Sequence, residues 1–166
     1  PGNDNTPSFT FYSNEAGTIT SSIGLPPTSA VVGNNTITFS TLNDGTYSGV
    51  WVRVTDATGN QSNQLTLNTF VIDTTAPTLT AVTQISAHTG DNTPSFKFSS
   101  NQTGTITSSH SFTSTTSAII GDNTIIFSVL GDGTYSGVWV KVTDAVGNQS
   151  NQLTLNNFVI DTVVPT

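Results

Sequence analysis

The chain carries one sequence twice, and this repetition constrains its fold more than any other feature. The offset is 87 residues between Asp4 and Asp91 and 88 residues between Gly59 and Gly147, so one residue is inserted near Phe112–Ser114. A period of this length is too long for a solenoid unit and suits one small domain. Three segments return unchanged: DNTPSF at 4–9 and 91–96, GTYSGVWV at 45–52 and 133–140, and GNQSNQLTLN at 59–68 and 147–156.

We therefore expect two tandem domains, residues 1–75 and 76–166, with 161–166 starting the next repeat. The tail DTVVPT matches DTTAPT at 73–78, which leads into the first strand of the second repeat. The first repeat has only Pro1-Gly2-Asn3 at the corresponding place. Its first strand is expected to be missing or supplied by another segment.

Alternation with a period of two runs through both repeats, and no helical pattern accompanies it. Seven short strands separated by turn residues in fewer than 100 residues indicate an immunoglobulin-like β-sandwich. The predicted class is all-β, with two such sandwiches in tandem. In the second repeat the expected strands are 78–87, 94–100, 104–110, 115–120, 123–130, 134–143 and 152–160.

Two details refine this interpretation. Tyr47 and Tyr135 each follow Asp-Gly-Thr, as does the corner tyrosine that ties a turn to upstream backbone in such sandwiches. The inward parity of Tyr47 disagrees with the valines that follow it, and a similar break separates Leu65 and Leu67 from Phe70. We expect bulges at 48–49 and 68–69, and at their counterparts in the second repeat.

The composition excludes several classes of protein. Three basic residues against ten acidic ones give a net charge of −7, which rules out the basic stripe that nucleic acid requires. Cysteine is absent, so neither a disulfide nor a zinc thiolate holds the fold. No apolar run approaches the roughly 18 residues of a membrane span, and no nucleophile with a partnered histidine suggests an enzyme.

Four motifs in register resemble the bacterial Ig-like repeats of large surface and secreted proteins: V-x-D-T-T-A-P-T at the junction, D-N-T-P-S-F, D-G-T-Y, and V-T-D-A-x-G-N-Q-S. The resemblance covers essentially the whole chain. It implies an extracellular or cell-surface location and a role as extender domains of an adhesin. In several such families calcium stiffens the junctions between repeats. The cysteine pair of some similar repeats is missing here.

The acidic residues fall in expected loops, and a junction calcium site is one explanation of them. Asp73, on the linker that enters domain 2, is expected to approach Asp144 and Asn148 of a turn at the same end of the sandwich. Carboxylate and amide oxygens that converge in this way suit Ca²⁺. The alternative is turn chemistry, because Asp and Asn before Gly bind nearby backbone.

The equivalent calcium candidates in domain 1 are Glu15, Asp56 and Asn60, and Asp161 ends domain 2 as Asp73 ends domain 1. Trp51 and Trp139 are expected on an outer sheet face, each followed two residues later by a cation. Such a pair binds sugar in some proteins, or it simply shields its own sheet.

The leading hypothesis is therefore a non-enzymatic extender whose partners are adjacent Ig-like repeats, or copies of itself, placed end to end. The first alternative is a subunit of an extracellular fibre or pilus assembled by β-strand donation, suggested by the missing first strand. The second alternative is a carbohydrate-binding module that uses Trp51 and Trp139. Neither nucleic acid nor membrane insertion is expected of this segment.

Overall fold

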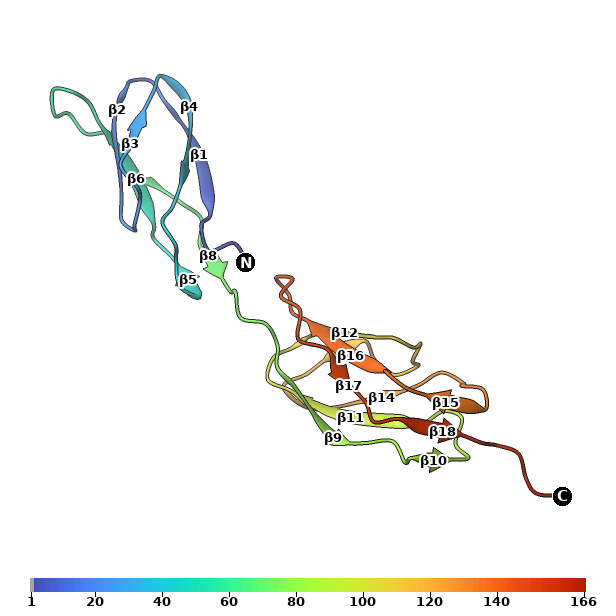
Figure 1. The fold of residues 1–166 in the computed structure, drawn as a ribbon. Coiled ribbons are helices and arrows are strands. Elements are labelled where there is room, and N and C mark those ends of the chain that lie inside the picture. Colours follow the sequence, from blue (N-terminus) through green and yellow to red (C-terminus); the bar gives the residue numbers. More distant parts are fainter. Residues whose placement is uncertain (1) are drawn as a thin grey trace. The chain divides into compact units, whose positions relative to one another are not determined.

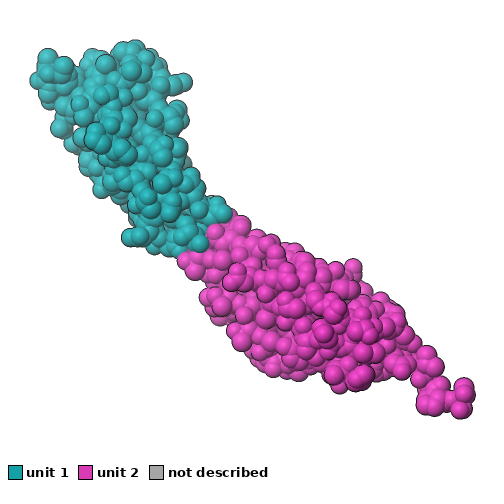
Figure 2. All heavy atoms as spheres, in the orientation of Figure 1, with its two compact units in different colours: residues 1–74 teal, residues 75–166 magenta. Residues whose placement is uncertain are grey.

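The computed structural model describes residues 2–166, and all the regular elements assigned within these residues are β-strands. The chain divides into two compact units, which Figure 2 colours separately: unit 1 is Pro1–Thr74 and unit 2 is Thr75–Thr166. The boundary lies in the DTTAPT segment, one residue before the expected one. Within the described residues no helix is long and apolar enough to cross a membrane.

The all-β class predicted from the alternation is confirmed, and the strands of both units follow one plan (Figure 1). Unit 1 contains β1 (Ser8–Ser13), β2 (Gly17–Ser21), β3 (Thr28–Ala30), β4 (Gly33–Thr38), β5 (Gly45–Tyr47), β6 (Trp51–Thr55), β7 (Leu65–Thr66) and β8 (Phe70–Ile72). Unit 2 contains β9 (Leu79–Thr83), β10 (His88–Thr89), β11 (Ser95–Ser100), β12 (Gly104–Ser108), β13 (Ser117–Ala118), β14 (Gly121–Ile126), β15 (Gly133–Tyr135), β16 (Trp139–Thr143), β17 (Leu153–Thr154) and β18 (Phe158–Ile160).

Three β-sheets, which we call ladders, surround the core of unit 2. One has the order β14-β11-β9, a second has the order β13-β12-β16-β17, and a third has the order β10-β18-β15. All neighbours are antiparallel except β10 and β18, which run parallel with His88 opposite Val159 and Thr89 opposite Ile160. Unit 1 repeats the second ladder as β3-β2-β6-β7, whereas its first is reduced to β1-β4 and its third to β5-β8.

The predicted bulges are breaks at which a strand changes ladder. In unit 1 the strand containing Tyr47 pairs with β8, but after Gly49 the chain continues as β6 and pairs with β2 and β7. Gly49 has a φ of 65°, a conformation that favours glycine, and Gly137 has the same value in unit 2. The parity break therefore had the right position, and its cause is a change of partner rather than one extra residue.

The cores are the inward faces of these ladders. In unit 2 Phe96, Phe98 and Phe127 are completely buried, together with valines from β16. The corner tyrosines are confirmed, because the hydroxyl of Tyr47 donates to the carbonyl of Asn43 at 2.9 Å, and Tyr135 has the same bond to residue 131. These contacts fix the turn that precedes each change of ladder.

One strand distinguishes the two units. In unit 2, β9 pairs antiparallel with β11 over Lys97–Ser100, with a register shift between Lys97 and Phe98. In the described part of unit 1, only Gly2 precedes β1 in a ladder, as an isolated parallel bridge to Ile72. The outer edge of β1 therefore has no strand beside it within residues 2–166.

Candidate functional site

The turn after β6 is built around Asp56, one of the residues expected to bind calcium. Its Oδ1 accepts hydrogen bonds from the backbone N–H groups of Thr58 and Asn60, both at 2.8 Å. Its Oδ2 accepts one from Nδ2 of Asn60, also at 2.8 Å, and the hydroxyl of Thr58 donates to both oxygens. The carboxylate is thus fixed by its own turn, which is the chemistry that favours Asp at such positions.

The same hydrogen bonds lower the pKa of this aspartate and of its counterpart. The side chain of Asn60, followed by its backbone N–H, holds the pKa of Asp56 at about 2. At Asp144 burial acts to raise the pKa, but bonds from the side chain and backbone of Asn148 and from Val146 outweigh it and leave the pKa below its ordinary value. Both carboxylates are ionised at neutral pH, and the negative charge strengthens the bonds they accept.

Glu15, Asp56 and Asn60 line one pocket of about 170 Å³ in unit 1, so the structure brings these three candidates together. The counterpart of Glu15 in unit 2 is Gln102, whose Nε2 donates to the carbonyl of Thr75 at 3.0 Å. In unit 2 this position therefore binds the backbone of the segment that enters the domain. Glu15 offers an acceptor where Gln102 offers a donor.

Asp73 and Asp161 follow the last strands of their units. The backbone N–H of Asp73 donates to the carbonyl of Gly2 at 3.1 Å, and that of Asp161 donates to the carbonyl of Thr89 at 3.0 Å. Among the described residues no three His, Cys, Asp or Glu side chains form a group that could hold a metal ion. The observed donors at Asp56 and Asp144 fit a hydrogen-bonded turn. Calcium binding by Asp73, Asp144 and Asn148 stays a prediction.

The two tryptophans lie under cations of the same strand. The guanidinium carbon of Arg53 is 5.3 Å from the ring centroid of Trp51, and Nζ of Lys141 is 5.3 Å from that of Trp139. Each cation is also tied to the neighbouring segment, for example by Nη1 of Arg53 to Oε1 of Gln61 at 3.1 Å. One face of each ring is therefore occupied by a cation of its own strand, which fits the shielding arrangement.

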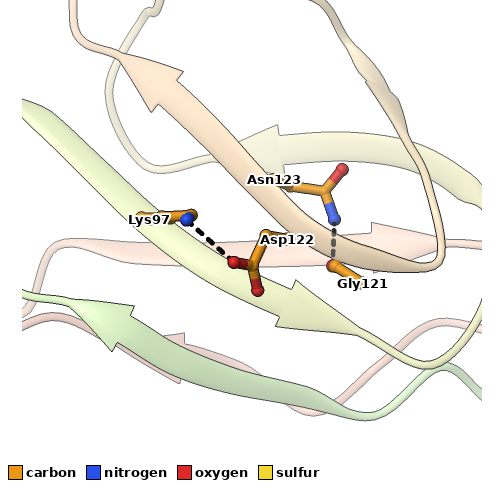
Figure 3. Close-up of polar contacts among 4 residues, drawn as sticks. All are labelled: Lys97, Gly121, Asp122 and Asn123. Carbon is orange, nitrogen blue, oxygen red and sulfur yellow. Dashed lines mark hydrogen bonds and ion pairs between the residues drawn. The ribbon is translucent and has the colours of Figure 1, made fainter.

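Each unit contains a buried asparagine, Asn35 or Asn123, that the sequence analysis did not identify as a structural residue. Asn123 is 7% exposed; its Oδ1 accepts the N–H of Ile119 at 2.8 Å, and its Nδ2 donates to the carbonyl of Ile119 at 2.9 Å. Nδ2 also donates to the carbonyl of Gly121 at 2.9 Å (Figure 3). Asn35 makes the same three bonds in unit 1. The signal was present, because Asn123 has the inward parity of Ile125 and Phe127. An asparagine at an inward position therefore indicates a side chain that holds a turn through hydrogen bonds to its backbone, which we call a turn lock.

Beside Asn123, Nζ of Lys97 forms an ion pair with Oδ2 of Asp122 at 2.8 Å (Figure 3). The two side chains are 41% and 52% exposed, and pairs of this kind contribute about 0–1 kcal/mol. Thr10 and Asn34 stand at the equivalent positions of unit 1, so the pair is a feature of unit 2 rather than of the repeat.

The sequence model of a family described as bacterial Ig-like domain (group 3) matches residues 33–120. The match begins at β4 in unit 1 and ends just before β14, so it covers one full period of the sequence across the boundary of the two units. No curated protein matches the chain. Because the matched stretch is more than half of the 166 residues, and because the all-β fold agrees with it, the chain belongs to the bacterial Ig-like domain family.

Proposed function

We propose that this chain is a pair of structural extender domains from an extracellular surface protein or adhesin, and that its work is reach and mechanical continuity. Bacterial Ig-like domains typically occur in extracellular or surface proteins, which supports the location. The near-identity of the two copies supports the role, because a spacer gains length from each repeat. This function requires no catalytic group and no cofactor.

The observation that carries the proposal is the parallel pairing of the last strand of each unit with the segment that precedes its DNTPSF motif. In unit 2, β10 and β18 run parallel; the N–H of Val159 donates to the carbonyl of Ala87 at 2.9 Å, and the N–H of Asp161 donates to that of Thr89 at 3.0 Å. In unit 1, Gly2 exchanges bonds with Val71 and Asp73 at 3.0 and 3.1 Å. In both copies the segment before the DNTPSF motif is therefore joined through backbone to the last strand.

Parallel pairing at this place determines how the unit carries a load. Force that reaches this pair from the two chain ends pulls the earlier segment and the last strand in opposite directions, along the strand direction. The hydrogen bonds cross between the strands, so the force shears them together instead of opening them one at a time. Figure 1 shows that the chain enters unit 2 near β9 and leaves it after β18 at the other end of that unit. A unit loaded in this way resists extension, as a spacer must.

The proposal is tested by varying repeat number in a displayed protein. The chain is placed between a surface anchor and a terminal epitope, as one copy of the 166 residues or as two. The distance at which a bead-bound antibody captures the epitope should increase with copy number. It should be unchanged when Trp51 and Trp139 are replaced by Phe. A reach that ignores copy number would contradict the extender role.

A second candidate, a subunit of a fibre assembled by β-strand donation, is motivated by one observation: within residues 2–166 no strand lies beside the outer edge of β1. Edges of this kind pair with strands from other chains when nothing blocks them. Size-exclusion chromatography with electron microscopy of the purified chain separates the candidates. Filaments that lengthen with concentration would favour the subunit, and a single species independent of concentration would favour the extender.

A further inference from the structure

We propose that the outer edge of β4 is a pairing site for β4 of a second copy of this chain. The two strands run antiparallel about a two-fold axis at Thr36, so that the β1-β4 sheets of two chains form one continuous sheet. This interaction goes beyond the extender role and does not require it.

The outer edge of β4 presents backbone groups that no strand covers within residues 2–166. On the inner side, the N–H of Phe39 donates toward β1, to the carbonyl of Pro7 at 3.1 Å. Backbone groups alternate in direction along a strand, so every second residue of β4 directs its N–H and C=O away from β1. These residues are Asn34, Thr36 and Thr38.

This edge does not depend on how unit 1 begins. Unit 2 contains β9, and its sheet has the order β14-β11-β9, so β9 lies on one side of β11 and β14 on the other. β14 is the counterpart of β4, and it stands at the edge of that sheet although β9 is present. A strand equivalent to β9 in unit 1 would lie on the far side of β1 and would leave β4 as it is.

In unit 2 a loop covers part of the equivalent edge. The N–H of Thr113 donates to the carbonyl of Ile126 at 2.8 Å, and the N–H of Ile126 donates to Oγ of Ser114 at 3.2 Å. Both loop residues belong to the segment that contains the one-residue insertion. Ile126 is the counterpart of Thr38, so the insertion supplies bonds at a position that is open in unit 1.

The corresponding loop of unit 1 is one residue shorter, and it has Pro26-Pro27 where unit 2 has Ser114-Thr115. Proline has no N–H to donate, so these two residues cannot bond a neighbouring strand as Thr113 does. The loop meets the chain just after β4, where the N–H of Ser40 donates to the carbonyl of Gly24 at 2.9 Å. The two repeats therefore differ in how far this edge is protected.

Charge distinguishes the two edges as well. Asp122 on β14 pairs with Lys97 at 2.8 Å, and charged side chains on an edge strand oppose pairing with another chain. Unit 1 has Asn34 and Thr10 at these positions, and residues 16–43 contain no Asp, Glu, Lys or Arg. Two copies with a net charge of −7 each can therefore approach along β4 without bringing like charges of this strand together.

The occupant is a second β4 because this strand complements itself. With Thr36 opposite Thr36 of the other copy, Asn34 lies opposite Thr38 in both directions, which gives roughly six backbone hydrogen bonds. On the exposed face, Oγ1 of Thr10 and Oγ1 of Thr36 are 2.9 Å apart, and Oγ of Ser8 and Oγ1 of Thr38 are 3.1 Å apart. Pairing extends these rows of hydroxyl groups across the new interface, where Thr pairs are favourable.

Sedimentation equilibrium of the full chain tests the proposal. One pair of short strands buries less than the roughly 1,200 Å² of stable complexes, so we expect association between about 0.1 and 1 mM. The average mass should rise from 17.3 kDa toward twice that value and no further, because a two-fold interface closes on itself. Amide exchange at Thr36 should slow about twofold when half of the chains are paired, and exchange at its counterpart Thr124 should not change.

Two proline variants identify the edge. Thr36→Pro removes an N–H that points away from β1, so it leaves the β1-β4 ladder intact and should abolish association. Thr10→Pro is the matched control, because it breaks the same hydroxyl pair but removes an N–H on the opposite edge of β1. Association should persist in this variant. The fluorescence of Trp51 checks that unit 1 is folded in each.

Two charge variants test the register, and they also test the edge if a proline variant fails to fold. Asn34→Asp with Thr38→Asp places like charges opposite each other in the proposed pair and should abolish association. Asn34→Asp with Thr38→Lys places opposite charges there, and this chain should associate at least as tightly as the original one.

Three outcomes would overturn the proposal. The first is a mass that stays at 17.3 kDa into the millimolar range. The second is an equal effect of the two proline variants, or a loss of association in Thr10→Pro alone, which would place the contact away from β4. The third is equal association of the two charge variants, because the strands would then not meet in this register.

Discussion

Phe9 and Phe96 are equivalent residues in two environments, because only unit 2 contains β9. Replacing each with Ala measures how much β9 contributes to the free energy of unfolding at this position. Phe96 stacks on Phe98 with ring centroids 6.2 Å apart and an interplanar angle of 17°; Phe9 stacks on Phe11 at 6.3 Å and 15°. Phe96 is completely buried, whereas Phe9 is partly buried at the uncovered edge. The two phenylalanines therefore have the same local sequence and stacking geometry, and they differ in whether a strand lies over them.

Phe96→Ala removes a completely buried side chain and leaves a cavity, which lowers the free energy of unfolding by about 3–5 kcal/mol. Phe9→Ala opens onto an edge that water already reaches, so only the transfer free energy of the side chain is lost, about 1.5–3 kcal/mol. The midpoints of these ranges, about 4 and about 2.3 kcal/mol, put the expected excess loss in unit 2 at about 2 kcal/mol.

Urea unfolding measures both losses, since each unit contains one tryptophan, and Trp51→Phe or Trp139→Phe isolates one signal. Ile37→Val and Ile125→Val are the matched controls, because these residues are 1% and 0% exposed; each should cost about 0.5–1.5 kcal/mol, equally in both units. Equal losses for Phe9→Ala and Phe96→Ala would refute the reasoning that β9 completes the core.

The remaining predictions concern the turns and the backbone clamp. Asn123→Ala should cost about 2–3 kcal/mol in unit 2, because three hydrogen bonds of a buried amide are lost, and a loss below about 0.5 kcal/mol in urea would exclude the turn lock. The pKa of Asp56 is depressed, so its contribution is fully present above about pH 4 and is lost as the pH falls to about 2; Asp56→Asn should flatten the acid dependence of unit 1 in this window. If calcium binds at Asp73 and Asp144, calorimetry should detect it, Asp144→Ala should remove it, and equal melting temperatures in chelator and in millimolar calcium would eliminate the site. Gly2→Pro removes the N–H that bonds Val71 and should lower the force that unfolds unit 1, whereas Gly2→Ala should not, since an added Cβ meets no atom nearer than 4.0 Å.

Features that depend on local sequence could be predicted. The period, the all-β class and the corner tyrosines follow from repeated motifs and from alternation. The parity break at Gly49 was visible, but its cause was not, because a bulge and a change of ladder give the same break in one strand. Only the pairing of β5 with β8 and of β6 with β2 distinguishes them.

Features that depend on a neighbouring strand could not be predicted so well. Alternation alone would place Leu65 in the core, but Leu65 is 44% exposed because no strand equivalent to β9 lies beside it in the described part of unit 1. Ala30 is buried although its small side chain gives a weak signal. The acidic candidates were recognised by position, but whether Asp56 serves a turn or an ion depends on donors that only the folded turn brings together.

The central claim is that the chain consists of two mechanically independent Ig-like domains, each closed by parallel pairing of its last strand with the segment that precedes its DNTPSF motif. Stretching single molecules by their two ends tests it directly. We predict two separate unfolding events, with length gains near the extended lengths of about 250 Å for unit 1 and about 310 Å for unit 2, less the folded length of each. One event with the combined length, or gradual extension without a force peak, would contradict the account.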